Sequence, residues 1–270
     1  MMKKNMWSRW ILALAVVWPF MAAARDRVRE KENFDFDWKF ILNADDRANA
    51  GMQVSEAGWQ DVQLPHDWSI SQNFDPKLSG SNGHLPGGIG WYRKTFRVDK
   101  KDKGRRIAVL FDGIYSRSDV YVNGQHLGFR PYGFCYQEHD LTPHLNYGAE
   151  NVLAVRVNNP LEHDSVARWY TGAGIYRHAW LVKTAEVHVA SYGTYVTTPV
   201  VTAERAEVRV RTSVANESKR IKTLSVRQQI TDGEGRTVVQ SGKQALQVAA
   251  GQTADTEHTL EIPRPQLWDC

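Results

Sequence analysis

The sequence predicts an all-β protein, and three observations support that prediction. Short runs in which apolar and polar residues alternate recur along the chain, as expected for strands with one buried face. The pair Asn123-Gly124 separates two such runs, and both residue types tolerate the positive φ of a tight hairpin turn. No amphipathic helical pattern follows residue 24, which disfavours a parallel α/β architecture.

The first 24 residues are predicted to be a secretory signal peptide. Basic residues (Lys3, Lys4 and Arg9) precede an apolar run over 10–21, and three alanines follow it. This order of charged, apolar and small residues is typical of a cleaved leader. The apolar run is shorter than the about 20 residues that span a bilayer, and an uncleaved anchor is the alternative. We therefore expect a secreted or periplasmic protein with no membrane span after the leader.

Charge and cysteine content narrow the class of protein. Three of the 34 Lys and Arg residues lie in the leader, so the rest of the chain has 31 against 30 Asp and Glu. A neutral balance argues against a nucleic-acid partner, which needs clustered basic residues. The two cysteines, Cys135 and Cys270, are too few for a disulfide framework, and Cys135 is predicted to be a small buried hydrophobe. The histidines show no metal-ligand spacing, so no metal and no cofactor is predicted.

The strand pattern predicts one β-domain after the leader. Residues 34–40 and 59–64 each alternate between apolar and polar side chains. Further strands are predicted over 91–98, 105–111, 119–128, 151–157 and 178–182. Short strands at such spacing are typical of a sandwich or a barrel. Between them, residues 69–90 are rich in Ser, Gly, Asn and Pro and are predicted to form a long loop, which in a compact domain is usually functional or disordered.

The composition changes near residue 184, which predicts a domain boundary. Trp and Gly become scarce, and Val, Thr, Arg and Gln alternate, as in Glu207–Arg211. We expect a first domain at 25–184 and a second at 185–270, which is immunoglobulin-like by its strand spacing. An immunoglobulin-like sandwich has about seven strands, and five or six are predicted here. We therefore expect an incomplete sandwich that exposes sheet edges and apolar surface.

Five segments together resemble a known enzyme family. They are Leu64–Trp68, Gly90–Phe96, Val120–Gly124, Asn151–Val157 and Arg168–Arg177. Their order and spacing are similar to the N-terminal half of glycoside hydrolase family 2, the β-galactosidase and β-glucuronidase group. The first and last segments are most similar to secreted bacterial β-galactosidases. The resemblance implies a jelly-roll, galactose-binding-like sandwich, then an immunoglobulin-like one, and then a (β/α)₈ barrel with two catalytic glutamates.

The resemblance also implies that the catalytic part is absent from this chain. A barrel takes about 250 residues, and the chain stops before one begins, as in a truncated or frame-shifted gene product. Glycoside hydrolysis needs two carboxyl groups, about 5–5.5 Å apart in retaining enzymes, and no catalytic residue is assigned here. We expect an inactive N-terminal fragment of a secreted β-galactosidase-type hydrolase acting in carbohydrate metabolism, with the missing barrel as its intramolecular partner.

The expected ligand is a β-galactoside or a plant or host glycan. Two other functions stay open, a free-standing carbohydrate-binding module of the lectin type and a structural interaction domain without a sugar site. The candidates for sugar contact are Asp67, Trp68, Arg168, Trp169 and Tyr170. The resemblance places Arg168, Trp169 and Tyr170 at the edge of the barrel's active site.

Aromatic rings stack on pyranose faces, and Arg donates charged hydrogen bonds in a fixed geometry. We expect Asp67 and Trp68 to reach the same pocket through the loop that follows them. The structural alternatives are an Asx-type turn at Asp67, capping of carbonyls by Arg168, and core packing of Trp169.

Two further groups of polar residues are not predicted to form sites. The run Glu138-His139-Asp140 is tempting as a triad, but neighbours on a strand point to opposite faces, so a turn is predicted instead. His178 stands where some relatives of the family carry an Asp that helps to bind a sodium ion. Because of that difference, no metal site is assigned.

Overall fold

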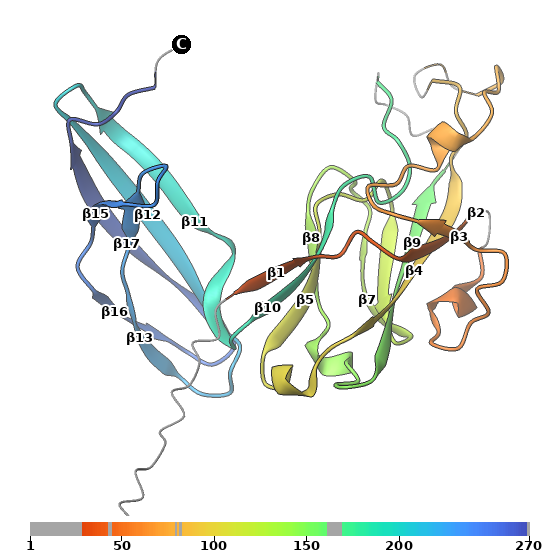
Figure 1. Ribbon diagram of the computed structural model, residues 1–270, viewed down its shortest axis with the longest axis horizontal. Helices are drawn as coiled ribbons and strands as arrows, with labels where there is room; N and C mark the ends of the chain where they lie inside the picture. Colours follow the sequence, from red (N-terminus) through yellow and green to blue (C-terminus); the bar gives the residue numbers. More distant parts are fainter. Residues whose placement is uncertain (1–28, 43–44, 79, 81–82, 161–168, 269–270) are drawn as a thin grey trace, which may run out of the picture.

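The structure is a computed structural model that describes residues 29–42, 45–78, 80, 83–160 and 169–268. The predicted leader therefore lies outside the described residues. Two β-sandwich domains lie beside each other and join where β10 (Ala179–Thr184) leads into β11 (Val187–Val201) (Figure 1). The helical segments of the described residues are short 3-10 turns, and none of them is long and apolar enough to cross a membrane. The predicted all-β fold class is confirmed.

The first domain is a jelly-roll of two antiparallel sheets. The six-stranded sheet has the order β3-β2-β4-β9-β6-β7, and the four-stranded sheet has the order β1-β10-β5-β8. The strands of the first sheet are β3 (Gln60–Val62), β2 (Trp38–Leu42), β4 (Gly88–Arg97), β9 (Glu150–Asn159), β6 (Ser118–Val122) and β7 (Gln125–Arg130). The second sheet adds β1 (Glu30–Asn33), β5 (Arg106–Phe111) and β8 (Gln137–Asp140) to β10.

The core between these sheets is rich in aromatic side chains. Trp38, Tyr92 and Phe111 are fully buried in it, and the rings of Trp38 and Tyr92 meet edge to face with their centroids 6.4 Å apart. Burial of rings of this size contributes much of a domain's stability. The core fixes the sheets on which the loops of the site are mounted.

The hairpin prediction is confirmed. The prediction that the strand over 151–157, here β9, buries only one face is wrong. Asn123 and Gly124 have φ values of 51° and 83°, as the tight turn between β6 and β7 requires. In β9, however, residues on both faces are buried. One face lies in the main core, and the other packs with Ala50 of the 3-10 turn Arg47–Ala50 and with Trp91 in a second cluster.

Three other local predictions are corrected. The strand predicted over 34–40 begins only at Trp38, and residues 34–37 form a bend. Asn33 and Asp35 exchange hydrogen bonds of 2.8 and 2.9 Å that compete with strand pairing, and Phe36 is left exposed. Residues 138–140 belong to a strand, β8, which pairs with β5, rather than to a turn. Cys135 is a free, half-buried thiol in the loop between β7 and β8 rather than a core residue.

The second domain has seven strands, more than the five or six predicted. One sheet has the order β11-β12-β17, with β12 at Arg205–Asn216 and β17 at Gln252–Pro263. The facing layer is made of two pairs, β13 (Lys222–Val226) with β16 (Gln244–Val248) and β14 (Gln229–Thr231) with β15 (Thr237–Gln240). The number of strands is higher because one long hairpin is interrupted on both sides. Its first side is divided into β13 and β14, and its second side into β15 and β16. The alternating burial predicted around Glu207–Arg211 is present in β12.

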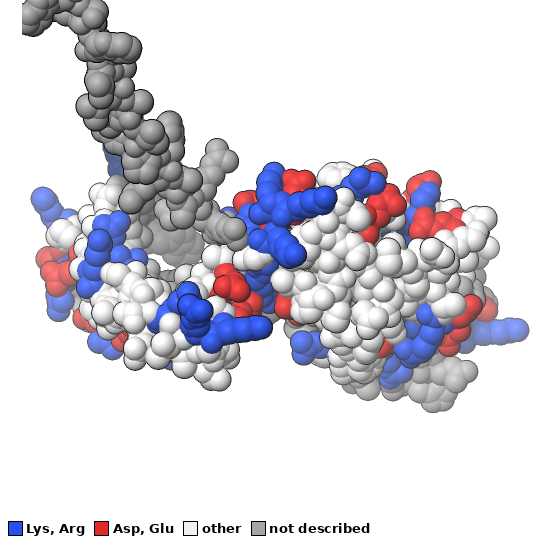
Figure 2. Space-filling view, turned by 90° about the horizontal axis from the view of Figure 1, so that it is seen from below, with Lys and Arg blue, Asp and Glu red and all other residues white. Residues whose placement is uncertain are grey.

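A charged contact joins the two domains. Arg106 of β5 reaches Glu138 of β8 with Nη1 at 2.6 Å from Oε1, and its Nε lies 2.9 Å from Oε1 of Glu217 in the second domain. Ser191 of β11 donates a hydrogen bond to Glu138 as well. Elsewhere, on the face seen in Figure 2, basic and acidic side chains are interspersed over both domains.

Candidate functional site

The candidate site lies where the chain after β3 meets the segment that follows residue 168. The hydroxyl of Tyr170 donates a hydrogen bond of 2.6 Å to Oδ2 of Asp67, which is 103 residues away in the sequence. Oδ1 of Asp67 accepts from the backbone N–H of Ser69 at 2.9 Å and of Ala173 at 3.0 Å. Asp67 therefore forms the Asx-type turn of the structural alternative and also ties two distant segments together.

Backbone contacts hold the same two segments at close range. His66 N–H donates to the carbonyl of Ile175 at 2.8 Å, and Trp68 N–H donates to that of Ala173 at 3.1 Å. Gly172 has a φ of +76°, and a Cβ there would lie only 2.8 Å from Oδ2 of Asp67. This approach requires a residue without a side chain that also tolerates positive φ, which is glycine.

The predicted site residues differ in their accessibility. Trp169 has 62% of its surface exposed, and Tyr170, whose hydroxyl is bonded to Asp67, has 39% exposed. Trp68 is only 1% exposed, and its ring stacks on Phe40 in the core with centroids 5.5 Å apart, so it presents no free face to a ligand. Arg168 lies outside the described residues. The structure thus brings Asp67 and Tyr170 together, and Trp169 precedes Tyr170 in the chain as an exposed ring.

Asp67 and Trp68 belong to the segment between β3 and β4, which continues as a long loop. It is pinned near its start, where the hydroxyl of Ser69 donates to the carbonyl of Pro86 at 2.7 Å. Within it lies a hollow of about 480 Å³ whose lining includes the exposed ring of Phe74. Sequence reasoning did not single out Phe74; a lone aromatic in a polar loop was the available signal.

The electrostatics of the cluster favour hydrogen bonding over proton transfer. Burial is the main cause that raises the pKa of Tyr170 far above its usual value, and the hydrogen bond to Asp67 is the second. This hydroxyl therefore stays a donor. Burial lowers the pKa of His66, whose Nδ1 lies 2.7 Å from the hydroxyl of Tyr92, so the imidazole is neutral at neutral pH. Among the residues of this cluster that the structure describes, Asp67 is the one carboxylate, whereas glycoside hydrolysis needs two.

Glu138, His139 and Asp140 do not converge on one point. Glu138 pairs with Arg106, His139 Nε2 lies 3.0 Å from Oε1 of Gln137, and Asp140 accepts from Thr142. No triad is formed there.

His178 makes a contact of its own. Its Nδ1 lies 2.7 Å from Oδ2 of Asp35. Over the described ranges, no group of three His, Cys, Asp or Glu residues is placed to hold a metal ion.

An exposed aromatic surface borders the site and was not predicted as a functional feature. It consists of Tyr132, Phe134 and Tyr136 from the loop between β7 and β8 and Tyr192 of β11. The rings of Tyr136 and Tyr192 lie 4.3 Å apart. The hydroxyl of Tyr176, from the site segment, donates to the carbonyl of Gly133 at 2.9 Å and connects this surface to the site. Three aromatics within five loop residues were the signal in the sequence.

Two protein-family models match this chain. The family model described as "Glycosyl hydrolases family 2, sugar binding domain" matches residues 32–185, and the one described as "Glycosyl hydrolases family 2" matches residues 187–270. Together the two models match nearly the whole of the described structure.

Relatives and solved structures agree with these matches. The chain is 42% identical over 249 residues to the β-galactosidase BoGH2A of Bacteroides ovatus and 33% identical over 267 residues to a β-glucuronidase of Formosa agariphila. It covers 28% and 26% of those proteins, with 89% of its own length in each case. A family 2 structure from Bacteroides cellulosilyticus superimposes with a TM-score of 0.79 at 39% identity, over 88% of this chain and 32% of that one.

Proposed function

We propose that this chain, which belongs to glycosyl hydrolase family 2, forms the sugar-contacting edge and scaffold of a secreted β-galactosidase-type hydrolase of carbohydrate metabolism. In this proposal the chain supplies no catalytic carboxylate, and the acidic pair lies in a barrel outside the described residues. The bond between Asp67 and Tyr170 carries the proposal, because it holds the segment of Trp169 against the loop after β3. A carboxylate bonded to Tyr170, which follows the exposed indole of Trp169 in the chain, suits a neutral sugar, whose hydroxyls donate and whose ring face stacks.

A galactoside fits this site better than a glucuronide. The carboxylate of Asp67 repels the carboxylate of a glucuronide but accepts hydrogen bonds from neutral sugar hydroxyls. The higher identity to a β-galactosidase, 42% against 33% to a β-glucuronidase, supports the same choice.

Calorimetric titration of the purified chain with a β-galactoside tests the sugar contact. We expect W169A to lose about 3- to 10-fold in affinity, because an aromatic contact contributes about 0.5–1.5 kcal/mol. W268A is the matched control, since Trp268 is also exposed but lies beyond the last strand of the second domain. Equal losses in both variants would contradict the placement of the site. Hydrolysis of a chromogenic β-galactoside by the chain alone would contradict the absence of a catalytic pair.

The aromatic surface is the face that we expect to contact the barrel. Exposed aromatic clusters of this kind mark protein interfaces, where Tyr and Phe form the anchors. Mixing the chain with a barrel-containing polypeptide from a relative should give a complex that Y132D weakens at least about tenfold. Y195D is the control, because Tyr132 and Tyr195 are both 60% exposed and Tyr195 lies in β11 of the second domain, outside the defined surface. A complex that Y195D weakens as much as Y132D would move the interface elsewhere.

A free-standing carbohydrate-binding module is the second candidate function. Two exposed rings favour it, that of Phe74, which lines the hollow in the loop between β3 and β4, and that of Trp169. Calorimetry separates the two functions: micromolar binding by the isolated chain would favour the module, whereas millimolar binding that tightens when a barrel is added would favour the edge of a larger site.

A further inference from the structure

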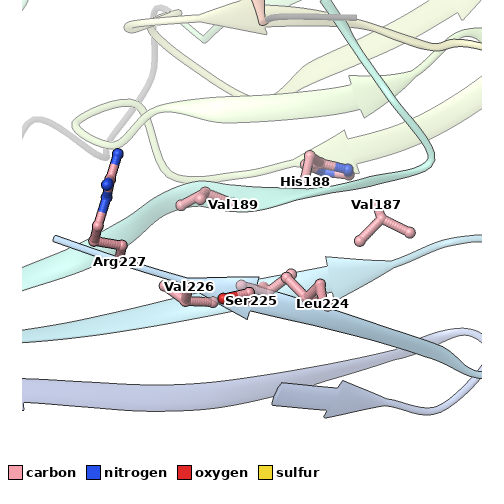
Figure 3. A pocket seen from close by; sticks show the side chains of 8 residues that line it. Val187, His188, Val189, Leu224, Ser225, Val226 and Arg227 are labelled. Carbon is pink, nitrogen blue, oxygen red and sulfur yellow. The ribbon is translucent and has the colours of Figure 1, made fainter. Parts of the chain in front are cut away.

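Two hollows of the molecule differ in the ligand that each suits. One lies between β11 and β13, and the described residues that line it include five aliphatic side chains but no Phe, Tyr or Trp (Figure 3). The other, in the loop between β3 and β4, combines the exposed ring of Phe74 with the polar side chains of Gln72, Asn73 and Asp75. A sugar presents both an apolar ring face and hydroxyl groups, so the hollow at Phe74 is the one suited to a sugar.

Phe74 faces solvent although its ring is large and apolar. It has 75% of its surface exposed, more than the 62% of Trp169. Covering such a ring with a ligand is favourable, because apolar area is removed from water. Single exposed apolar side chains are common on protein surfaces, so the ring alone assigns no ligand. Phe74 differs from them because it lines a hollow of about 480 Å³, a volume within the range of ligand pockets, roughly 300–1,000 Å³.

The polar side chains of the hollow can supply the hydrogen bonds that sugar hydroxyls need. The amide groups of Gln72 and Asn73 each offer an acceptor oxygen and two N–H donors. Within the described part of the chain, neither amide group forms a hydrogen bond to another residue, so both are available to a ligand. Oδ1 of Asp75 accepts from the N–H of Lys77 at 2.9 Å, which fixes this carboxylate at the wall of the hollow.

Hydrogen bonds across the loop hold the walls of the hollow in place. The N–H of Asp75 donates to the carbonyl of His84 at 2.9 Å, and Nδ1 of His84 lies 2.8 Å from the carbonyl of Leu78. The hydroxyl of Ser69 ties the start of the loop to Pro86, which also lines the hollow. Walls that are already formed lower the cost of ordering the loop when a ligand binds.

The loop that carries the hollow adjoins the contact between Asp67 and Tyr170 at both of its ends. The 3-10 turn Ser69–Ser71 leads directly to Gln72 of the lining, and such a turn rises only about 2.0 Å per residue. Near the other end of the loop, a Cβ on Gly83 would lie 4.0 Å from Cδ2 of Tyr170, which is ordinary contact distance. The whole loop also lies within residues 32–185, which the sugar binding domain model matches.

We propose that the hollow at Phe74 is a second sugar subsite, and that the ligand is therefore a neutral β-galactosyl oligosaccharide rather than a single galactoside unit. The galactosyl unit contacts the cluster around Asp67 and Tyr170. A further sugar unit stacks on Phe74, and its hydroxyls meet the amide groups of Gln72 and Asn73. This extension of the ligand rests on the proposed sugar contact, because the same glycan occupies both places.

Calorimetric titration of the full chain tests the subsite with three neutral probes: methyl β-galactoside, the disaccharide lactose and the trisaccharide β-galactosyl-lactose. The trisaccharide should bind about 3- to 10-fold more tightly than methyl β-galactoside. F74A should remove that advantage and leave the affinity for methyl β-galactoside unchanged, whereas F74Y, which keeps the ring, should retain it. I70A is the matched control, because Ile70 is 67% exposed in the same loop but lies outside the lining of the hollow.

Hydrogen exchange adds a readout that locates the ligand. The trisaccharide should protect amides in 72–78 that methyl β-galactoside leaves unprotected. Equal affinities for the three probes, or an advantage that F74A leaves intact, would overturn the subsite. If W169A weakens binding of methyl β-galactoside while F74A changes nothing, the subsite fails and the proposed sugar contact stands. Trisaccharide binding that F74A weakens and W169A does not would keep the hollow as a sugar site and contradict the contact at Trp169. Failure of all three probes to bind would overturn both.

Discussion

The two domains are built on the same principle but bury very different cores. The first domain encloses fully buried Trp38, Tyr92 and Phe111 between two broad sheets. The second relies on a small aliphatic cluster around Val208, Val210 and Leu260, with partly buried neighbours and open sheet edges. Large rings packed on all sides stabilise a domain by themselves, whereas a thin sandwich with open edges gains stability from whatever covers it. The candidate sugar site lies on the self-sufficient domain.

The largest expected effect comes from removing the centre of the first core. W38A should lower the free energy of unfolding of the first domain by about 3–5 kcal/mol, because it creates a large cavity among rings that cannot collapse. L260A should cost the second domain only about 2 kcal/mol, because its thinner core relaxes into the gap. Urea denaturation followed by domain-resolved hydrogen exchange measures both. Equal losses would contradict the contrast between the two cores.

Acid should destabilise the first domain next most strongly. Burial, more than the nearby charges, lowers the pKa of His139 from 6.5 to about 4. Below pH 6.5 the unfolded chain takes up a proton at this residue that the folded domain resists, so the free energy of unfolding decreases until pH falls to about 4. The shift corresponds to about 3 kcal/mol at most. H139Q should flatten the dependence measured by denaturant titration between pH 7 and 4.

H144Q is the control for that experiment, because His144 lies exposed in the same domain. A pH dependence that H139Q leaves unaltered would show that other groups carry it.

The smallest effect is expected at the junction of the two domains. R106A leaves Glu138 and Glu217 without their shared cation, but both keep some contact with solvent, so we expect a loss of about 1–2 kcal/mol. Small-angle scattering should show a wider spread of domain orientations, with each domain still folded. An unchanged scattering profile would mean that the Tyr136–Tyr192 contact is enough to hold the domains.

The sequence predicted the local features of the fold well and the site only in part. The Asn123-Gly124 hairpin and the alternation in β12 followed from turn chemistry and from the period of two. The bend at residues 34–37 was missed, because hydrogen bonds between side chain and backbone at Asn33 and Asp35 overrode an alternating pattern. Of the five candidate site residues, Asp67 and Tyr170 meet, Trp169 is exposed and Trp68 is in the core, whereas Arg168 lies outside the described residues.

What the sequence by itself determined is the all-β class, the positions of most strands and the membership of family 2, because strand periodicity, turn residues and motif order are local or linear properties. The tertiary structure alone decided which surfaces are covered. It buried both faces of β9, placed Trp68 against Phe40, and brought Tyr170 to Asp67 across 103 residues. The physical reason is that burial depends on what packs against a side chain, and the packing partners come from distant parts of the chain.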